Sequence, residues 1–342
     1  MKQTLTALTG ACVLALSTQA IADTKPPHVY GTMSARVVDF SDTNFIGQDV
    51  DATPTLYEGI VGLKGMHFLS NGMKLAYQFE ADFAPIAEAD GTESKYYGST
   101  STEDPIFIRY AGAALITKYG LFAFGDAMSG VYSEFYSAVD VFEVNTQDST
   151  PTGAPNGSRM WTQTKWSKDG LVYKTPVWNH MFAKMVYAST TNESGEADDL
   201  KIIHGVYRDD RFMFGVNLSV YDKSLTGISN GVDDRKRLVV ASHYNWDNFG
   251  LAGVYEKNTA MGTAGADFNV KAITGKYTDG AFSAAVSWQN REEPSAGVLT
   301  ADTAKLAKVS YQVDPMLEVW MEAGKYSDSD NDNIGVGTKV KF

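Results

Sequence analysis

The histidines, and aspartates that repeat at short spacing, are the residues of this sequence whose side chains could catalyse a reaction or bind a metal. The histidines are His28, His67, His180, His204 and His243. Hydrolysis by a Ser/His/acid or acid/His set needs the members of the set close together. His204 and His243 lie within alternating, strand-like segments without a Gly-x-Ser-x-Gly motif, and no two histidines have the spacing of metal ligands. We therefore expect no enzyme activity and no cofactor.

Three aspartates, Asp328, Asp330 and Asp332, repeat at every second position, as in the first half of a calcium-binding loop. Such a loop needs Gly at its sixth position and Glu at its twelfth. Asn333 and Lys339 occupy these positions. We expect no dedicated metal site, and loose binding of divalent cations remains the alternative.

The amino-terminal residues have the pattern of an export signal. Lys2 precedes a short apolar run from Leu5 to Leu16, and Ala20-Ile21-Ala22 is a small-x-small cleavage site. Cys12 lies inside the apolar run and lacks the usual leucine of a lipoprotein signal three positions before it. We predict a signal peptide over residues 1–22 and a single domain over 23–342, without disulfides.

Composition excludes several classes of protein. The formal net charge is −12, which becomes −13 when Lys2 is removed with the signal, because residues 1–22 contain no acid. Nucleic-acid binding needs a basic face, so a nucleic-acid partner is not expected. The remaining chain has no apolar run long enough for a membrane helix, yet it contains 18 Tyr, 17 Phe and 31 Gly. A soluble all-β protein and a membrane β-barrel remain.

Alternation of apolar and polar residues favours the barrel. In 73–83, 212–221 and 281–290, apolar side chains occupy every second position over about ten residues, the length of a tilted strand that crosses a bilayer. Strands of soluble sandwiches average about five or six residues. The connections alternate between tight and long, which is typical of outer-membrane barrels. The tight ones are 69–72, 117–120, 178–180, 209–210, 247–250, 279–280 and 314–315. The long ones are 39–54, 84–104, 129–158, 190–199, 223–234, 259–267, 291–302 and 327–332.

Seven tight turns and eight long loops predict a sixteen-stranded antiparallel transmembrane β-barrel. An even number of strands lets the last strand pair antiparallel with the first, so that no edge is left unpaired in hydrocarbon.

Several segments, in order along the whole mature chain, resemble the general bacterial (Gram-negative, trimeric, sixteen-stranded) outer-membrane porin family. The last of them is a final strand that ends in an aromatic residue. These segments are 28–33, 61–65 with 71–80, 109–115 with 119–125, 173–176, and the strand that ends at Phe342.

The resemblance implies a general diffusion porin of the outer membrane, which passes small hydrophilic solutes and ions through a water-filled pore. It also implies a homotrimer, contact with outer-membrane lipid and lipopolysaccharide, and folding by the barrel-assembly machinery, whose signal would be Phe342, Val340 and Val336. A substrate-specific channel, and a barrel that acts mainly as an adhesin or phage receptor, are the alternatives.

In this family the third long loop folds into the barrel, and its carboxylates face basic side chains of the wall. The acids of the corresponding loop here are Asp140, Glu143, Glu134 and Asp148. The period of two places basic side chains on the water-filled side, because a charge facing lipid is costly. The predicted basic wall residues are Arg36, Lys64, Lys74, Arg109, Arg159 and Lys165, with Lys168 as an alternative to Arg159 and Lys165 on the sixth strand.

The sequence departs from the family at two wall positions where Arg is frequent. Ile60 occupies the first, and Asp126 occupies the second, directly after Gly125. The outer loops are also rich in acids, such as Asp42, Asp49 and Glu88. Acidic vestibules concentrate cations and repel anions. We therefore expect a weak transverse field and a preference for cations.

Overall fold

The computed structural model describes residues 25–40, 55–69, 71–83, 106–146, 160–163, 165–167, 170–191, 197–221, 235–261, 266–295, 298–327 and 332–342. Seventeen strands belong to the sheet, and one of them, β6, has two residues and pairs only with the end of β5. The remaining sixteen strands form the wall.

The strands before the third long loop are β1 (Lys25–Phe40), β2 (Thr55–Phe68), β3 (Lys74–Asp82), β4 (Phe107–Thr117) and β5 (Gly120–Met128). A single π-helical turn, η1 (Tyr132–Tyr136), follows. The strands after it are β6 (Trp166–Ser167), β7 (Gly170–Lys174), β8 (Met181–Thr191), β9 (Ala197–Arg208), β10 (Phe212–Tyr221), β11 (Arg235–Trp246), β12 (Phe249–Thr259), β13 (Phe268–Asp279), β14 (Phe282–Ser295), β15 (Val298–Gln312), β16 (Leu317–Tyr326) and β17 (Asn333–Lys341). In the described part of the chain, no helix has the length and apolarity that crossing a membrane requires.

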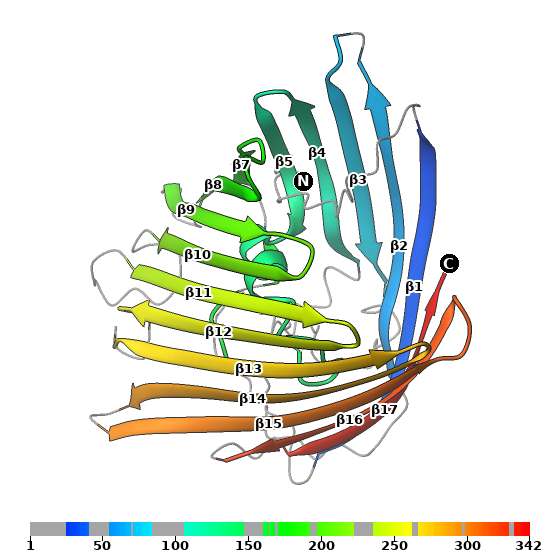
Figure 1. Ribbon diagram of the computed structural model, residues 1–342, viewed down its shortest axis with the longest axis vertical. Coiled ribbons are helices and arrows are strands. Elements are labelled where there is room, and N and C mark those ends of the chain that lie inside the picture. Colours follow the sequence, from blue (N-terminus) through cyan, green and yellow to red (C-terminus); the bar gives the residue numbers. More distant parts are fainter. Residues whose placement is uncertain are drawn as a thin grey trace, which may run out of the picture.

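The wall is a closed antiparallel barrel (Figure 1). Each strand pairs with its neighbour in sequence, β5 pairs with β7, and β1 closes the ring by pairing with β17 from Thr32↔Lys341 to Phe40↔Asn333. The closing pair continues to the last residue, because Gly31 and Phe342 exchange both backbone hydrogen bonds, at 2.9 and 3.1 Å. Closure leaves no edge strand. The expected even number of strands allows this closing pair to be antiparallel.

All seven predicted tight turns join neighbouring strands at one end of the barrel, which we call the turn side. Gly72 and Gly280 have positive φ angles of 80° and 56°, and Asp247 has a φ angle of 48°. These conformations favour Gly, Asn and Asp, which is why such residues mark the turns in the sequence. Some strands run further than predicted. The prediction of a long loop over 291–302 was wrong for most of these residues, since the β14–β15 ladder extends from Phe282↔Tyr311 to Ser295↔Val298. Backbone hydrogen bonds between strands do not require alternating apolar residues, which were the basis of the prediction.

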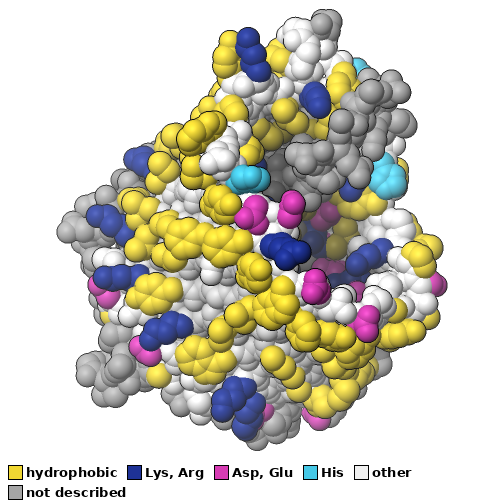
Figure 2. Space-filling view, in the orientation of Figure 1, with side chains coloured by type: hydrophobic (Ala, Val, Ile, Leu, Met, Phe, Trp, Pro, Cys, Tyr) yellow, Lys and Arg dark blue, Asp and Glu magenta, His cyan; other side chains and the backbone are white. Residues whose placement is uncertain are grey.

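The two faces of the wall differ as the alternation predicts. Large apolar side chains such as Val29, Leu171 and Val286 are exposed on the outer face, at 62%, 58% and 63%. Figure 2 shows this apolar cover over the strands. Polar side chains such as Asn217 and Glu256 alternate with them and are buried in the interior. The outer face therefore suits hydrocarbon and the inner face suits water and polar contacts.

Candidate functional site: segment 129–146 and the interior wall

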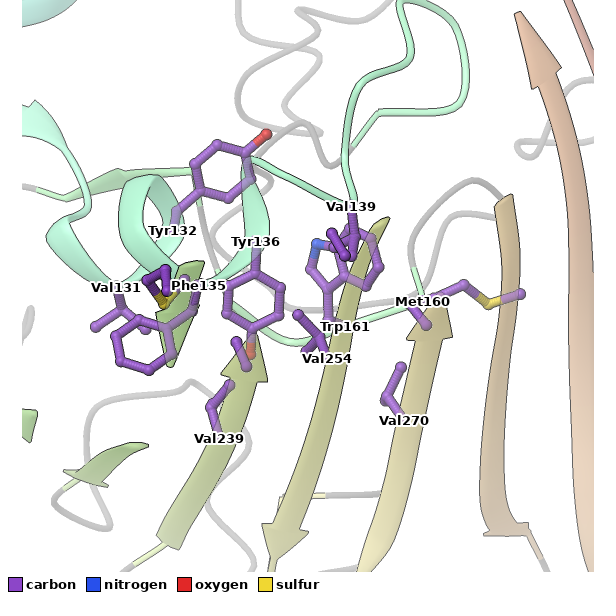
Figure 3. Close-up of a cluster of buried hydrophobic side chains, with 14 of the residues drawn as sticks. Val131, Tyr132, Phe135, Tyr136, Val139, Met160, Trp161, Val239, Val254 and Val270 are labelled. Carbon is purple, nitrogen blue, oxygen red and sulfur yellow. The ribbon is translucent and has the colours of Figure 1, made fainter. Parts of the chain in front are cut away.

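Segment 129–146 leaves β5 and packs against the inner face of the barrel. Phe135 and Tyr136 of η1 are almost completely buried in one cluster with Val239 of β11 and Val254 of β12 (Figure 3). Trp161 belongs to the same cluster, and its ring centroid lies 5.4 Å from that of Tyr136. Burial of these aromatic side chains stabilises the segment by the hydrophobic effect.

Glu134 is the acid of η1, and its carboxylate is buried between two strands. It forms an ion pair with Lys184 of β8 at 2.5 Å and lies 2.9 Å from Nε2 of His204 of β9. Burial by itself would raise the pKa of Glu134, but Lys184 and His204 outweigh it and lower this pKa to about 2. The carboxylate is therefore ionised at neutral pH and fixes the helical turn to the wall.

Glu143 makes the second link between the segment and the wall. Its carboxylate oxygens lie 2.8 Å from Nζ of Lys308 of β15 and 2.7 Å from Nζ of Lys339 of β17. Arg36 of β1 donates to the backbone carbonyl of Glu143 at 3.1 Å. Burial opposes ionisation, but the charges of Lys339 and Lys308 lower the pKa of Glu143 below its ordinary value. Side chains of β1, β15 and β17 thus contact the same residue, Glu143.

The backbone of the segment is held by wall carboxylates and hydroxyls. Glu322 of β16 accepts hydrogen bonds from the amides of Glu143, Val144 and Asn145, at 2.6, 3.2 and 2.7 Å. Thr274 of β13 donates to the carbonyl of Val139 at 3.0 Å. Irregular backbone in a barrel interior needs such partners, since it lacks those of a regular ladder.

Asp140, another predicted acid, has two described hydrogen bonds within the segment itself. It accepts hydrogen bonds from the hydroxyls of Tyr132 at 2.6 Å and Thr146 at 3.0 Å. Asp148 lies outside the described residues. The described contacts therefore join Glu134 and Glu143 to basic wall residues and join Asp140 to side chains of its own loop.

Arg109 lies among acids of the wall, not beside Glu134 or Glu143. Its guanidinium lies 2.8 Å from Glu80, 3.5 Å from Glu58 and 3.9 Å from Asp82. The register of the β3–β4 ladder shifts between Glu80 and Ala81, beside this arrangement. Three carboxylates around one guanidinium make this part of the wall acidic.

The other predicted basic residues occupy separate places. Nζ of Lys64 lies 4.6 Å from the centroid of the Tyr30 ring, and that of Lys74 lies 5.2 Å from the Phe68 ring. Nζ of Lys165 lies 5.8 Å from the Tyr132 ring of η1. Arg159 lies outside the described residues, as does Lys168. Two predicted wall residues have described hydrogen bonds to segment 129–146: the Arg36 side chain donates to the carbonyl of Glu143, and the backbone carbonyl of Lys165 accepts from the amide of Ser129 at 2.8 Å.

The partners of the loop acids were missed by sequence reasoning. Lys184, His204, Lys308, Lys339 and Glu322 were not among the predicted site residues. Each of them has at least one apolar neighbour on the outer face, so the alternation of side chains along a strand predicts that it points inward. The alternation does not say which of the many inward side chains the loop will reach.

The carboxyl-terminal residues predicted as an assembly signal share the outer face. Val336, Val340 and Phe342 are exposed at 47%, 36% and 54%. The Phe342 ring lies over Gly31, where a Cβ atom would come within 2.2 Å of Cζ of the ring. A glycine at position 31 thus lets the terminal ring cover the closing pair of strands.

The described part of the chain contains no cluster of side chains arranged as metal ligands. No group of three or more His, Cys, Asp or Glu residues is arranged there to hold a metal ion. Asp332 accepts hydrogen bonds from Lys325 and from the backbone amide of Tyr326, whereas Asp328 and Asp330 lie outside the described residues.

Comparison with known proteins identifies a family. A family model described as Gram-negative porin matches residues 4–334. No curated protein matches the chain.

Solved structures that resemble this one are also porins or outer-membrane proteins. OmpF of Salmonella typhi, solved in complex with daunomycin, is 16% identical, with a TM-score of 0.69 over 92% of this chain and 97% of that one. A loop-deletion mutant of OmpT, an outer membrane protein of Vibrio cholerae, is 12% identical, with a TM-score of 0.67 over 93% and 99%. An anion-selective porin from Comamonas acidovorans is 12% identical, with a TM-score of 0.66 over 94% and 100%. At these identities the likeness concerns the fold.

Proposed function

Because the chain belongs to the Gram-negative porin family, we propose that this outer-membrane channel is a general diffusion porin for small hydrophilic solutes and ions. The observation that carries the proposal is the closed ring of strands with an apolar outer face and a polar inner face. Such a wall needs no cofactor and no energy input to pass solutes that fit its interior. The family and the fold favour a channel over an enzyme.

Segment 129–146 is, in this proposal, the loop that narrows the pore. Its support is the set of contacts that Glu134 and Glu143 make with Lys184, Lys308 and Lys339 across the interior. Rings and patches of charged side chains determine which ions a pore prefers. The acidic surroundings of Arg109 and the acids of the outer loops favour cations over anions.

We further propose that residues 1–22 are removed on export and that the mature chain forms a homotrimer. A trimer form has been solved for OmpT of Vibrio cholerae, which shares this fold. Barrel-assembly machinery that reads Phe342, Val340 and Val336, and lipopolysaccharide around the outer rim, complete the proposed set of partners. Amino-terminal sequencing of the protein purified from outer membranes should begin at Asp23.

Planar-bilayer recording of the purified protein tests the function. We expect conductance to rise in steps that group in threes, and the reversal potential in a KCl gradient to have the sign of a cation-preferring pore. Absence of conductance from folded protein would overturn the channel, and a reversal potential of the opposite sign would overturn the ion preference alone.

A further inference from the structure

The inward face near the turn side carries positive charges that segment 129–146 does not neutralise. Lys74 is the first residue of β3 and Lys174 is the last of β7, so both lie next to tight turns. Lys276 lies three residues before the end of β13, and Lys341 is the last residue of β17. Lys64 of β2 and Arg208 of β9 belong to the same band. We call these six residues the basic band.

Alternation and contacts establish that the band faces the interior. Lys174 stands opposite Lys184 in the β7–β8 ladder, and its Nζ lies 3.8 Å from the centroid of the inward ring of Phe182. Lys341 alternates with the outward residues Val340 and Phe342. Lys276 lines an interior recess together with Lys308.

Acids do not balance this charge. Glu134 and Glu143 are engaged by Lys184, Lys308 and Lys339, and none of the six residues of the basic band forms an ion pair with a described residue. Some described residues lie within five positions of the strand ends on the turn side. Among them, the acid on the inner face is Glu318, which lies opposite Lys339 in the β16–β17 ladder.

The other turn-side acids lie in the turns or at strand ends. Asp209 accepts hydrogen bonds from the amides of Arg211 and Phe212, and Asp314 accepts them from Met316 and Leu317. These carboxylates serve the backbone of the turns. Asp279, the last residue of β13, follows the inward position of Thr278 and so belongs to the outer face. In Figure 2 charged side chains of both signs gather at the edge of a hollow.

A recess within this region offers a place for a ligand. Its volume is about 290 Å³, and Val141 of segment 129–146 is one of the residues that line it. Its donors include the ammonium groups of Lys276 and Lys308, the hydroxyls of Ser283 and Ser310, and the amide of Gln312, and the carboxylate of Glu318 lines it as well. Ammonium and hydroxyl donors suit the several oxygens of a phosphate group, and ionised partners make the stronger hydrogen bonds.

We propose that the turn-side half of the interior is a binding vestibule for multivalent phosphate-type anions, with the recess at Lys276 as its seat. Like charges on the low-dielectric wall of a cleft focus the field and raise the local concentration of counter-ions by about tenfold or more. The vestibule would retain anions that the acidic outer half of the channel repels. The proposal goes beyond passive diffusion, and it rests on the barrel being an open channel.

One-sided block of the channel tests the vestibule. Inorganic tripolyphosphate is added to one side and then to the other side of a bilayer that contains conducting channels. We expect it to interrupt the current at a concentration about tenfold or more lower from one side than from the other. Raising the salt from 0.1 M to 1 M should weaken the block, because the Debye length falls from about 10 Å to about 3 Å.

Two charge-matched variants connect the block to the basic band. Replacing Lys74, Lys174 and Lys276 by Gln should raise the half-blocking concentration from the sensitive side by about tenfold or more. The control replaces Lys236, Lys257 and Lys305, which are exposed on the outer face, by Gln and should leave it unchanged. Conducting channels that tripolyphosphate does not block, or equal effects of the two variants, would overturn the vestibule. Absence of current would instead oppose the channel itself.

Discussion

Glu134 and Glu143 each meet two nitrogen-bearing side chains from strands that are distant in the sequence. Glu143 lies 165 residues from Lys308 and 196 residues from Lys339. Breaking one partner of a buried ion pair leaves the other charge uncompensated, which usually costs about 3–5 kcal/mol. A substitution of either acid should therefore loosen the attachment of segment 129–146 to the wall.

Acid should release η1 by protonating Glu134. The folded-state pKa of Glu134 is about 2, below its ordinary value of 4.5. The stabilisation is thus complete above about pH 4.5 and is lost as the pH falls toward 2. We expect open-channel current noise to rise in this interval.

The Glu134→Gln variant should show increased current noise already at pH 7, because Lys184 loses its charged partner. Glu292→Gln is the control, since Glu292 pairs with Lys271 at 3.3 Å at a partly exposed position. An acid transition of unchanged size in Glu134→Gln would show that another group causes it.

The second residue-scale prediction concerns ion preference. Glu143→Gln removes one negative charge between Lys308 and Lys339, so the interior becomes more positive. We expect the cation-to-anion permeability ratio, measured as a reversal potential in a KCl gradient, to fall by about twofold or more. Glu292→Gln makes the same change in net charge and should leave the ratio unaltered. Equal ratios in both variants would contradict a role of Glu143 at the constriction.

At the scale of elements, the closing pair of β1 and β17 depends on a glycine. A Cβ atom at Gly31 would lie 2.2 Å from Cζ of Phe342 and 2.7 Å from the carbonyl oxygen of Ile60. A Cβ atom at Gly205, another outward glycine, would meet nothing within 4 Å. The ring can rotate away, but the Ile60 carbonyl belongs to the β1–β2 ladder and moves only with the backbone.

We expect Gly31→Ala to destabilise the barrel by about 1–3 kcal/mol, because overpacking displaces backbone or rings. Gly205→Ala should have little effect or a slightly stabilising one. Denaturant titration of the protein refolded into detergent micelles measures both. Similar midpoints for the two variants would show that the end of β17 adjusts without cost.

The tight turns could be predicted from the sequence, whereas the π-helical turn η1 could not. Gly72, Asp247 and Gly280 mark tight turns in the sequence because their backbone conformations suit few other residue types. The π-helical turn at 132–136 has no comparable signal, because its support comes from Val239 and Val254 on strands about one hundred residues away.

At the scale of the whole molecule, the two faces of the wall should tolerate charge differently. Val309 of β15 is exposed on the outer face at 44%, whereas its neighbour Ser310 lines the interior recess. Val309→Lys should cost up to about 2–4 kcal/mol in a lipid bilayer, because a lysine at the midplane loses its hydration. Ser310→Lys should cost much less.

Folding of both variants into lipid vesicles, followed by urea titration, checks this difference at one depth of the barrel. Detergent-solubilised protein should show a smaller difference between the variants than the bilayer does. Equal stability of Val309→Lys and Ser310→Lys in the bilayer would mean that the outer face does not meet hydrocarbon.

The sequence by itself determined the number of wall strands, their tight turns and the face on which each side chain lies. These properties follow from local rules, since alternation has a period of two and tight turns need particular residues. Only the tertiary structure decided that Arg109 joins Glu58, Glu80 and Asp82, and that Glu143 joins Lys308 and Lys339. Alternation gives the face of each side chain, but it does not give the side chain's partner among the many inward residues of neighbouring strands, nor the strands that the loop of Glu143 will reach.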